Sequence, residues 1–123
     1  MKLHSTAPVG LNTFTGYGVG YVVVNAARHT RSLVVLPDRV ITDWSASTFE
    51  ALDARHLAPL VDCGLEILLL GTGDRLRFPA PGILRPLVEA GVGVEVMDVP
   101  AACRTYNILA AESRRVGAAL LLG

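Results

Sequence analysis

The stretch 66-EILLLGTGDRLRFP-79 begins as a short apolar run, stops at Gly71-Thr72-Gly73, and then becomes charged. Residues Glu66–Leu70 have the length and apolar content of a buried strand. The two glycines permit the tight turn that must follow such a strand. A buried strand that ends in a glycine turn is typical of α/β domains, in which ligands gather beyond the carboxyl ends of the strands.

Helical and strand patterns alternate on both sides of this strand. We predict helices from Asp53 or Ser47 to about Asp62, from Ile83 to Ala90 and from Ala101 to Arg115, with strands at Val92–Met97 and Gly117–Leu122. Pro59 predicts a kink or a late start in the first helix, whereas Pro86 fits the second helix only in its first turn. Strands separated by helices of this length usually pair in parallel, so we expect a three-strand parallel core.

The first part of the chain has the composition of β structure. Tyr21–Asn25 and Ser32–Leu36 are rich in β-forming residues, and Ala26–His29 is expected to close a hairpin between them. A further short strand is expected at Thr13–Thr15, and Pro37-Asp38 should end this section with a turn. The predicted fold class is α/β, with the N-terminal hairpin forming a mixed edge or a second small sheet. We expect a three-layer β/β/α-like arrangement and one domain over residues 1–123.

Composition and charge narrow the range of functions. Hydrophobic residues make up 51% of the chain and charged residues 18%, which favours a compact globule over disorder. The net charge is zero and no run of like charges occurs, so nucleic acid is not an expected partner. Cys63 and Cys103 lack metal-ligand spacing, and no cofactor or metal is predicted. The first four residues show no secretory pattern and no apolar run could cross a bilayer, so a cytoplasmic location is expected.

The glycine turn is the first candidate site. Its amides and the Thr72 hydroxyl are suited to holding an anion, with Arg75 as a source of charge. The turn does not match GxGxxG, and no GK[ST] follows, so the nucleotide-binding fingerprints are missing. A plain tight turn with Asp74 as a cap is the favoured interpretation.

The second candidate is 97-MDVPAACRTYN-107, where Asp98 ends a strand and Pro100 enters a helix. The positive end of that helix should face the same crevice as the glycine turn. Cys103 could act as a nucleophile there, but a small buried side chain is favoured because no histidine is placed as its base. Asn107, four residues on, should bind either a ligand or the backbone of the glycine turn. Trp44 is expected to be buried at the edge of the core rather than exposed.

Three segments together, LLLGTGDR, GVEVMDVPAACRTYN and ILAAESRRVGAALLL, resemble a family of small uncharacterised α/β domains. This family includes a mitochondrial respiratory complex I assembly factor, and the chain is most similar to its bacterial single-domain members. The segments GYGVGYVVVN and SLVVLPDRVITDW fit the family's opening hairpin. The resemblance implies an α/β/β arrangement with a parallel half, and it supplies no reaction.

The family's motifs fall on particular residues of this chain. Its glycine turn matches Gly71, Thr72 and Gly73, and its helix start matches Asp98, Ala102, Thr105, Tyr106 and Asn107. Ser113 departs from the pattern, because many relatives have glycine after the glutamate that matches Glu112.

Two functional hypotheses follow. The first is a non-enzymatic interaction or assembly protein with partners in a membrane or respiratory complex, which predicts an exposed apolar patch or an exposed β edge. The alternative is a small-molecule or anion site in a crevice between Gly71-Thr72-Gly73 and the start of the 101–115 helix. Arg75 or Arg104 would supply charge there, and Thr105 or Asn107 would supply hydrogen bonds. An enzyme with Cys103 as nucleophile is the third possibility.

Overall fold

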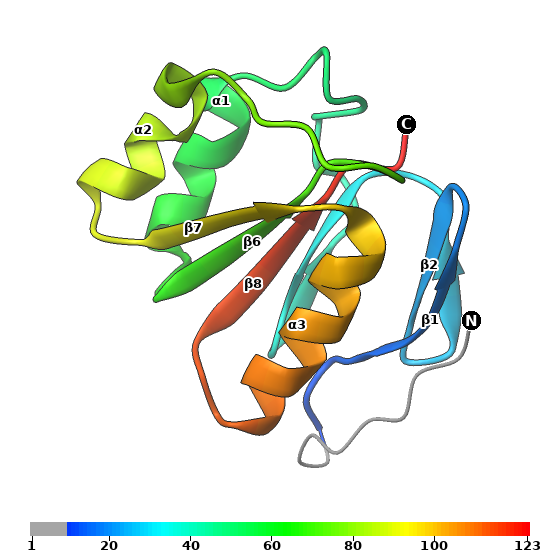
Figure 1. The fold of residues 1–123 in the computed structure, drawn as a ribbon. Helices are drawn as coiled ribbons and strands as arrows, with labels where there is room; N and C mark the ends of the chain where they lie inside the picture. The colour runs from blue at the N-terminus through cyan, green and yellow to red at the C-terminus, as the bar shows by residue number, and fades with distance from the viewer. Residues whose placement is uncertain (1–9) are drawn as a thin grey trace.

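The computed structural model describes residues 10–123 (Figure 1), so the prediction about the first four residues lies outside this range. Eight strands are present: β1 (Phe14–Gly18), β2 (Tyr21–Val24), β3 (Ala27–His29), β4 (Leu33–Leu36), β5 (Arg39–Ile41), β6 (Ile67–Gly71), β7 (Gly93–Met97) and β8 (Val116–Leu120). The helices are α1 (Ala54–Leu57), the 3-10 helix η1 (Ala58–Cys63), α2 (Pro81–Glu89) and α3 (Val99–Ala111). None of these helices is long and apolar enough to span a membrane.

The strands form two sheets. β1, β2 and β3 make a small antiparallel sheet, and the larger sheet has the order β5-β4-β8-β6-β7. Within the larger sheet β6 pairs in parallel with both β7 and β8, which confirms the three-strand parallel core. β4 and β5 extend it through antiparallel pairs with β8 and with each other. The expected α/β class with an added N-terminal β section is therefore confirmed.

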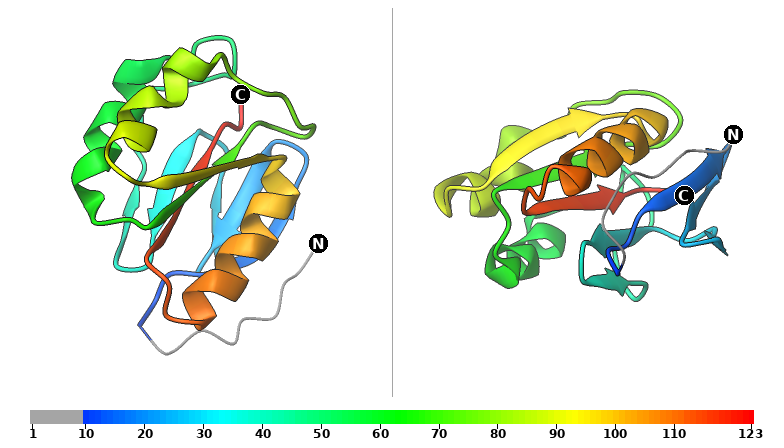
Figure 2. Two further views of the ribbon diagram at one scale, coloured as in Figure 1. Left: turned by 60° about the vertical axis from the view of Figure 1, so that its left-hand side comes forward. Right: turned by 90° about the horizontal axis from the view of Figure 1, so that it is seen from below.

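The larger sheet is the middle layer of the molecule (Figure 2). One face packs against α3 and the small sheet, through a core that includes Phe14, Val22, Leu69 and Tyr106. The other face packs against α1, η1 and α2, through a core that includes Leu57, Leu68 and Leu87. Both faces are buried because β6 and β8 carry apolar residues at almost every position, as central parallel strands do. That a single domain covers residues 1–123 stays a prediction.

The predicted hairpin between Tyr21–Asn25 and Ser32–Leu36 is wrong. β2 pairs with β3, whereas β4 belongs to the other sheet. The turn lies at Asn25 and Ala26, whose φ angles are +50° and +70°, as a two-residue hairpin turn requires. Alanine rarely adopts such angles, so the sequence carried only a weak signal for this turn. The chain also forms β5 after Pro37-Asp38, where only a turn was predicted.

The prolines shape the two helices on the far face. Asp53 caps α1, as predicted, by accepting a hydrogen bond from the Arg55 N–H. The α-helix changes to the 3-10 helix η1 just before Pro59, and Gly64 ends it at a φ of +71°. The placement of Pro86 in a first turn is wrong, because α2 already begins at Pro81 and Pro86 lies inside it. The real first turn therefore uses Pro81, which needs no N–H partner there.

α3 begins two residues earlier and ends four residues earlier than predicted. Its end is a left-handed turn at Ser113, whose φ is +62°. The Arg114 N–H donates to the Leu109 carbonyl and the Ser113 N–H to the Ala110 carbonyl, which is the Schellman pattern. Ser113 thus occupies a position whose backbone conformation favours glycine.

Trp44 is half-buried, between the two expected extremes. It packs against the core on the α1 side of the sheet, and its Nε1 donates to the His56 carbonyl at 2.9 Å.

Candidate functional site

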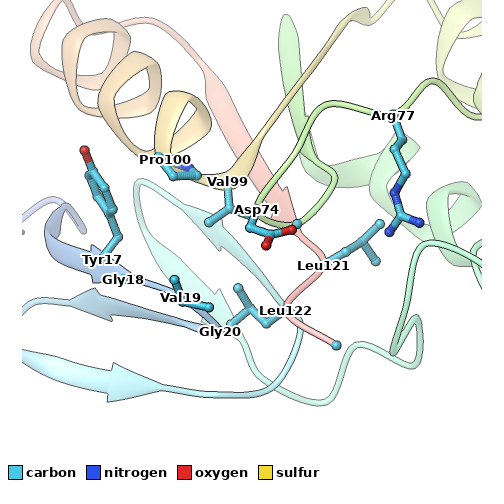
Figure 3. A pocket seen from close by; sticks show the side chains of 12 residues that line it. Tyr17, Gly18, Val19, Gly20, Asp74, Arg77, Val99, Pro100, Leu121 and Leu122 are labelled. Atoms are coloured by element: carbon cyan, nitrogen blue, oxygen red, sulfur yellow. The ribbon is translucent and has the colours of Figure 1, made fainter.

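A cavity of about 520 Å³ lies at the carboxyl ends of β6 and β8, beside the start of α3 (Figure 3). Four segments line it: the β1–β2 turn, the loop after β6, the first residues of α3, and Leu121–Gly123. This is the edge of a parallel sheet where ligands usually bind, and the volume is in the range of small-molecule sites. The cavity therefore occupies the place of the predicted crevice between the glycine turn and the helix.

The glycine turn is built to pack and to hold its own loop. A Cβ on Gly71 would lie 2.7 Å from Leu120 Cδ2 and 3.3 Å from Val99 Cα, so only glycine lets β6 approach α3 this closely. Thr72 is fully buried. Its hydroxyl donates to the Arg75 carbonyl at 2.8 Å and accepts from the Arg77 N–H at 3.0 Å. The hydroxyl thus ties the 73–77 loop together, and only Gly73 of the three turn residues lines the cavity.

The positive end of α3 is closed by protein atoms. The Val99 N–H donates to the Gly73 carbonyl at 2.8 Å, and Pro100 has no N–H. Asp98 caps the helix by accepting from the Ala101 N–H at 2.8 Å. The first-turn donors that would attract an anion are therefore absent or already used.

Asn107 was predicted to bind either a ligand or the backbone of the glycine turn. It does bind backbone, but the partner is Phe14 and not the glycine turn. Its side-chain amide donates to the Phe14 carbonyl and accepts from the Phe14 N–H. Asn107 therefore joins α3 to β1 and does not line the cavity.

The remaining predicted residues lie around the cavity rather than in it. Arg104 is exposed, and its Nη1 donates to the Tyr17 hydroxyl at 2.8 Å. Arg75 is exposed on the loop after β6, and Thr105 is half-buried on α3. That any of these residues contacts a ligand stays a prediction.

Cys103 is fully buried in the core between α3 and the sheet. Burial raises the pKa of its thiol to about 12, against a smaller opposing effect of Arg104. The thiol is therefore protonated at neutral pH, and its sulfur has no path to a substrate. Within residues 10–123 no three His, Cys, Asp or Glu side chains gather as a metal site.

Sequence reasoning missed most of the residues that line the cavity. Val19, Val99, Leu121 and Leu122 make apolar walls, and the carboxylate of Asp74 points inward (Figure 3). The glycine-rich 16-GYGVG-20 signalled a turn but not its proximity to the loop after β6. Only the packing of the small sheet against the rest of the fold brings these segments together.

Arg77 is the basic residue of the lining, and it is engaged elsewhere. Its Nη1 lies 2.7 Å from Glu50 Oε2, and its guanidinium lies 4.4 Å from the centre of the Phe49 ring. Its Nε is buried without a hydrogen-bond partner. A backbone hydrogen bond lowers the pKa of the Glu50 carboxyl from its usual value, and the hydrogen bond from Arg77 lowers it further.

Exposed apolar side chains occur on two of the loops that line the cavity. Val19, in the β1–β2 turn, is 87% exposed. Leu76 and Phe78 flank Arg77 in the chain and are 48% and 74% exposed. We call Val19, Leu76 and Phe78 the apolar rim. They are three of the five large apolar residues exposed among residues 10–123, the others being Val88 and Ile108.

A model of the protein family of unknown function DUF498/DUF598 matches residues 14–121. The chain belongs to this family. The match spans both sheets and all helices of residues 10–123, and it includes every lining residue of the cavity except Leu122 and Gly123.

The family relatives include a named assembly factor. The NADH dehydrogenase [ubiquinone] 1 alpha subcomplex assembly factor 3 of Bos taurus is 36% identical over 101 residues, or 80% of this chain. This chain matches 54% of that protein's length, so it spans about half of the relative.

Solved structures of the family share the fold. A crystal structure from Bordetella parapertussis is 43% identical, with a TM-score of 0.85, and covers 93% of this chain and 98% of its own. A solution structure from Bordetella pertussis, described as a Mth938-like domain, is 37% identical with a TM-score of 0.79. It covers 98% of this chain and 92% of its own.

Proposed function

We propose that this protein is a non-enzymatic interaction protein that assists the assembly of a protein complex, and that its partner belongs to a membrane-bound respiratory complex. The kinship with the bovine assembly factor supports this role. The hydrogen bonds of Thr72, Asp98 and Asn107 also support it, because the polar side-chain groups of these residues bind the protein's own backbone.

The apolar rim is the observation that carries the proposal. Isolated exposed apolar residues are normal, but here Val19 lines the cavity, and Leu76 and Phe78 flank the lining residue Arg77 on a second loop. Interfaces place aromatic and aliphatic side chains beside well-formed hollows. The rim and the cavity together form the docking surface that we propose.

The test is crosslinking of the tagged protein in its native cells, followed by mass spectrometry. The rim variant carries Val19→Asp and Phe78→Asp, and the matched control carries Val88→Asp and Ile108→Asp. The control changes two residues of similar exposure that do not line the cavity. We expect the wild type and the control to crosslink the same subunits or assembly factors, and the rim variant to lose them. Equal recovery by all three, or no recurrent protein, would contradict the proposal.

A small-molecule ligand in the same cavity is the second candidate, favoured by its volume of about 520 Å³. The inward carboxylate of Asp74 and the closed end of α3 disfavour the anionic version. Native mass spectrometry of protein purified from its own cells is the test. A stoichiometric mass increment that disappears on unfolding would support this candidate, and a bare protein mass would argue against it.

A further inference from the structure

Asp74 is the charged group of the cavity that has no hydrogen bond or ion pair with residues 10–123. Asp74 lines the cavity and is exposed to solvent, and its carboxylate points inward (Figure 3). No described residue from 10 to 123 gives it a hydrogen bond or an ion pair. Arg77, the basic residue of the lining, is paired with Glu50, while Arg75 and Arg104 lie outside the lining. Among the lining residues, Asp74 is therefore the charged group without a partner of opposite charge.

The walls around this carboxylate are apolar. Val99 and Pro100 form one side, and Leu121 and Leu122 form another, with Val19 at the mouth. An occupant that satisfies the whole site needs an apolar body and a cationic group on the side of Asp74.

Bare backbone also lines the cavity. Gly20 and Gly73 contribute no side chains and the space beside them is open, so another main chain can approach them closely. A Cβ on Gly18 would collide with the Tyr21 ring, whereas one on Gly20 would meet open space at a φ of +77°. A compact amine has no need of these backbone edges, but an extended peptide segment does.

We infer that the cavity binds an extended segment of a partner protein, which inserts an apolar side chain and places a neighbouring lysine or arginine against Asp74. This inference rests on the proposed function and specifies the chemistry of the partner. The charge complementarity at Asp74 selects this occupant over an acidic segment, because like charges at an interface are strongly disfavoured.

The test is selection of a random peptide library on the intact protein. Three baits are compared: wild type, Asp74→Lys, and Glu89→Lys as a matched charge change at an exposed acid on α2. We expect wild type and Glu89→Lys to enrich peptides with a basic residue beside an apolar one. The Asp74→Lys bait should lose the basic preference. A wild-type pool without basic residues, or an unchanged pool on Asp74→Lys, would overturn the inference.

Binding of one selected peptide then locates the site and measures the charge effect. We expect amide chemical-shift changes at Gly18, Gly20 and Gly73, and a loss of about 5-fold in affinity for Asp74→Asn, as for an exposed ion pair. High salt should weaken the wild-type binding toward that of the variant. Shift changes confined to other surfaces would overturn the inference. If no peptide is enriched, the small cationic probe phenethylamine is titrated instead. Shift changes at Gly18, Gly20 and Gly73 would then assign the cavity to a small amine and overturn the inference.

These results are separable from the test of the proposed function. The rim variant could lose its partner while substitution of Asp74 has no effect. That result would support the proposed interaction role and refute only the inference that a basic segment binds the cavity.

Discussion

Asn107 holds the backbone of Phe14 with both ends of its side-chain amide. Its Nδ2 donates to the Phe14 carbonyl at 2.7 Å, and its Oδ1 accepts from the Phe14 N–H at 2.9 Å. One side chain thus gives this end of β1 what a neighbouring strand would give, and fastens the small sheet to α3. The Phe14 ring is fully buried and meets the Tyr106 ring edge-on at 5.2 Å.

Asn107→Ala should lower the free energy of unfolding by about 2–4 kcal/mol, because two backbone groups beside the core lose their partners. Urea denaturation would measure this loss. Ile108→Ala is the control, since Ile108 is 61% exposed on the same helix. A loss for Asn107→Ala no larger than for the control would show that water replaces the two bonds.

Ser113→Gly should stabilise the protein by about 0.5–1 kcal/mol, because Ser113 holds a left-handed φ that glycine adopts without strain. α2 ends with the same pattern of hydrogen bonds at Gly91, whose φ is +80° and whose missing Cβ would meet open space. The exchange Gly91→Ser should therefore destabilise by a similar amount. Calorimetry of the two single variants checks the pair, and shifts of Tm in the same direction would refute the backbone explanation.

Thr72→Val should destabilise by about 1–3 kcal/mol, because the Arg75 carbonyl and the Arg77 N–H lose the buried hydroxyl. Thr72→Ser keeps the hydroxyl and should cost less. Amide hydrogen exchange of residues 73–77 is the second readout, and it should accelerate in the valine variant only. Equal exchange in both variants would mean that other contacts hold this loop.

Stability should fall as the pH rises above about 9. The pKa of the Cys103 thiol is about 12 in the fold because of burial, against 9.0 for the unperturbed thiol. The unfolded chain therefore releases this proton first, which favours unfolding by about 1.4 kcal/mol per pH unit across that window. Burial, with a smaller effect of Asp38, also raises the pKa of Tyr106 and adds to the slope at higher pH.

Cys103→Ala should show a shallower decline of the unfolding free energy between pH 9.5 and 11 than the wild type. Denaturant titrations at several pH values measure this slope. The variant has lower stability at neutral pH from its smaller side chain, so the slope and not the midpoint is decisive. Parallel slopes would show that the buried thiol titrates normally.

The parallel half of the fold was predictable because its signals are local. The apolar run of β6, the cap at Asp53 and the stop at Gly91 each follow from a few neighbouring residues. The N-terminal half was less predictable, because Ala26 supports a turn that usually calls for glycine. Nothing in Leu33–Leu36 reveals that its partner is β8, more than eighty residues along the chain.

The position of the cavity was predictable, but its chemistry was not. The rule that ligands gather at strand ends located the crevice beside Gly73 and the start of α3. The polar residues that motifs singled out, Thr72 and Asn107, proved to bind backbone. Most of the lining residues are apolar or glycine and come from four segments, so only the assembled sheets reveal them.

The position of β8 in the middle of the larger sheet affects how the protein is made. β4 and β5 lie on one side of β8, and β6 and β7 lie on the other. On the ribosome, β8 emerges after every other strand described. Until then the two halves have no common neighbour. The hydrogen-bonding edges with which β4 and β6 pair with β8 have no partner strand. The larger sheet therefore closes only after Val116–Leu120 has been made, and a pause before Val116 leaves the edges of β4 and β6 that pair with β8 open.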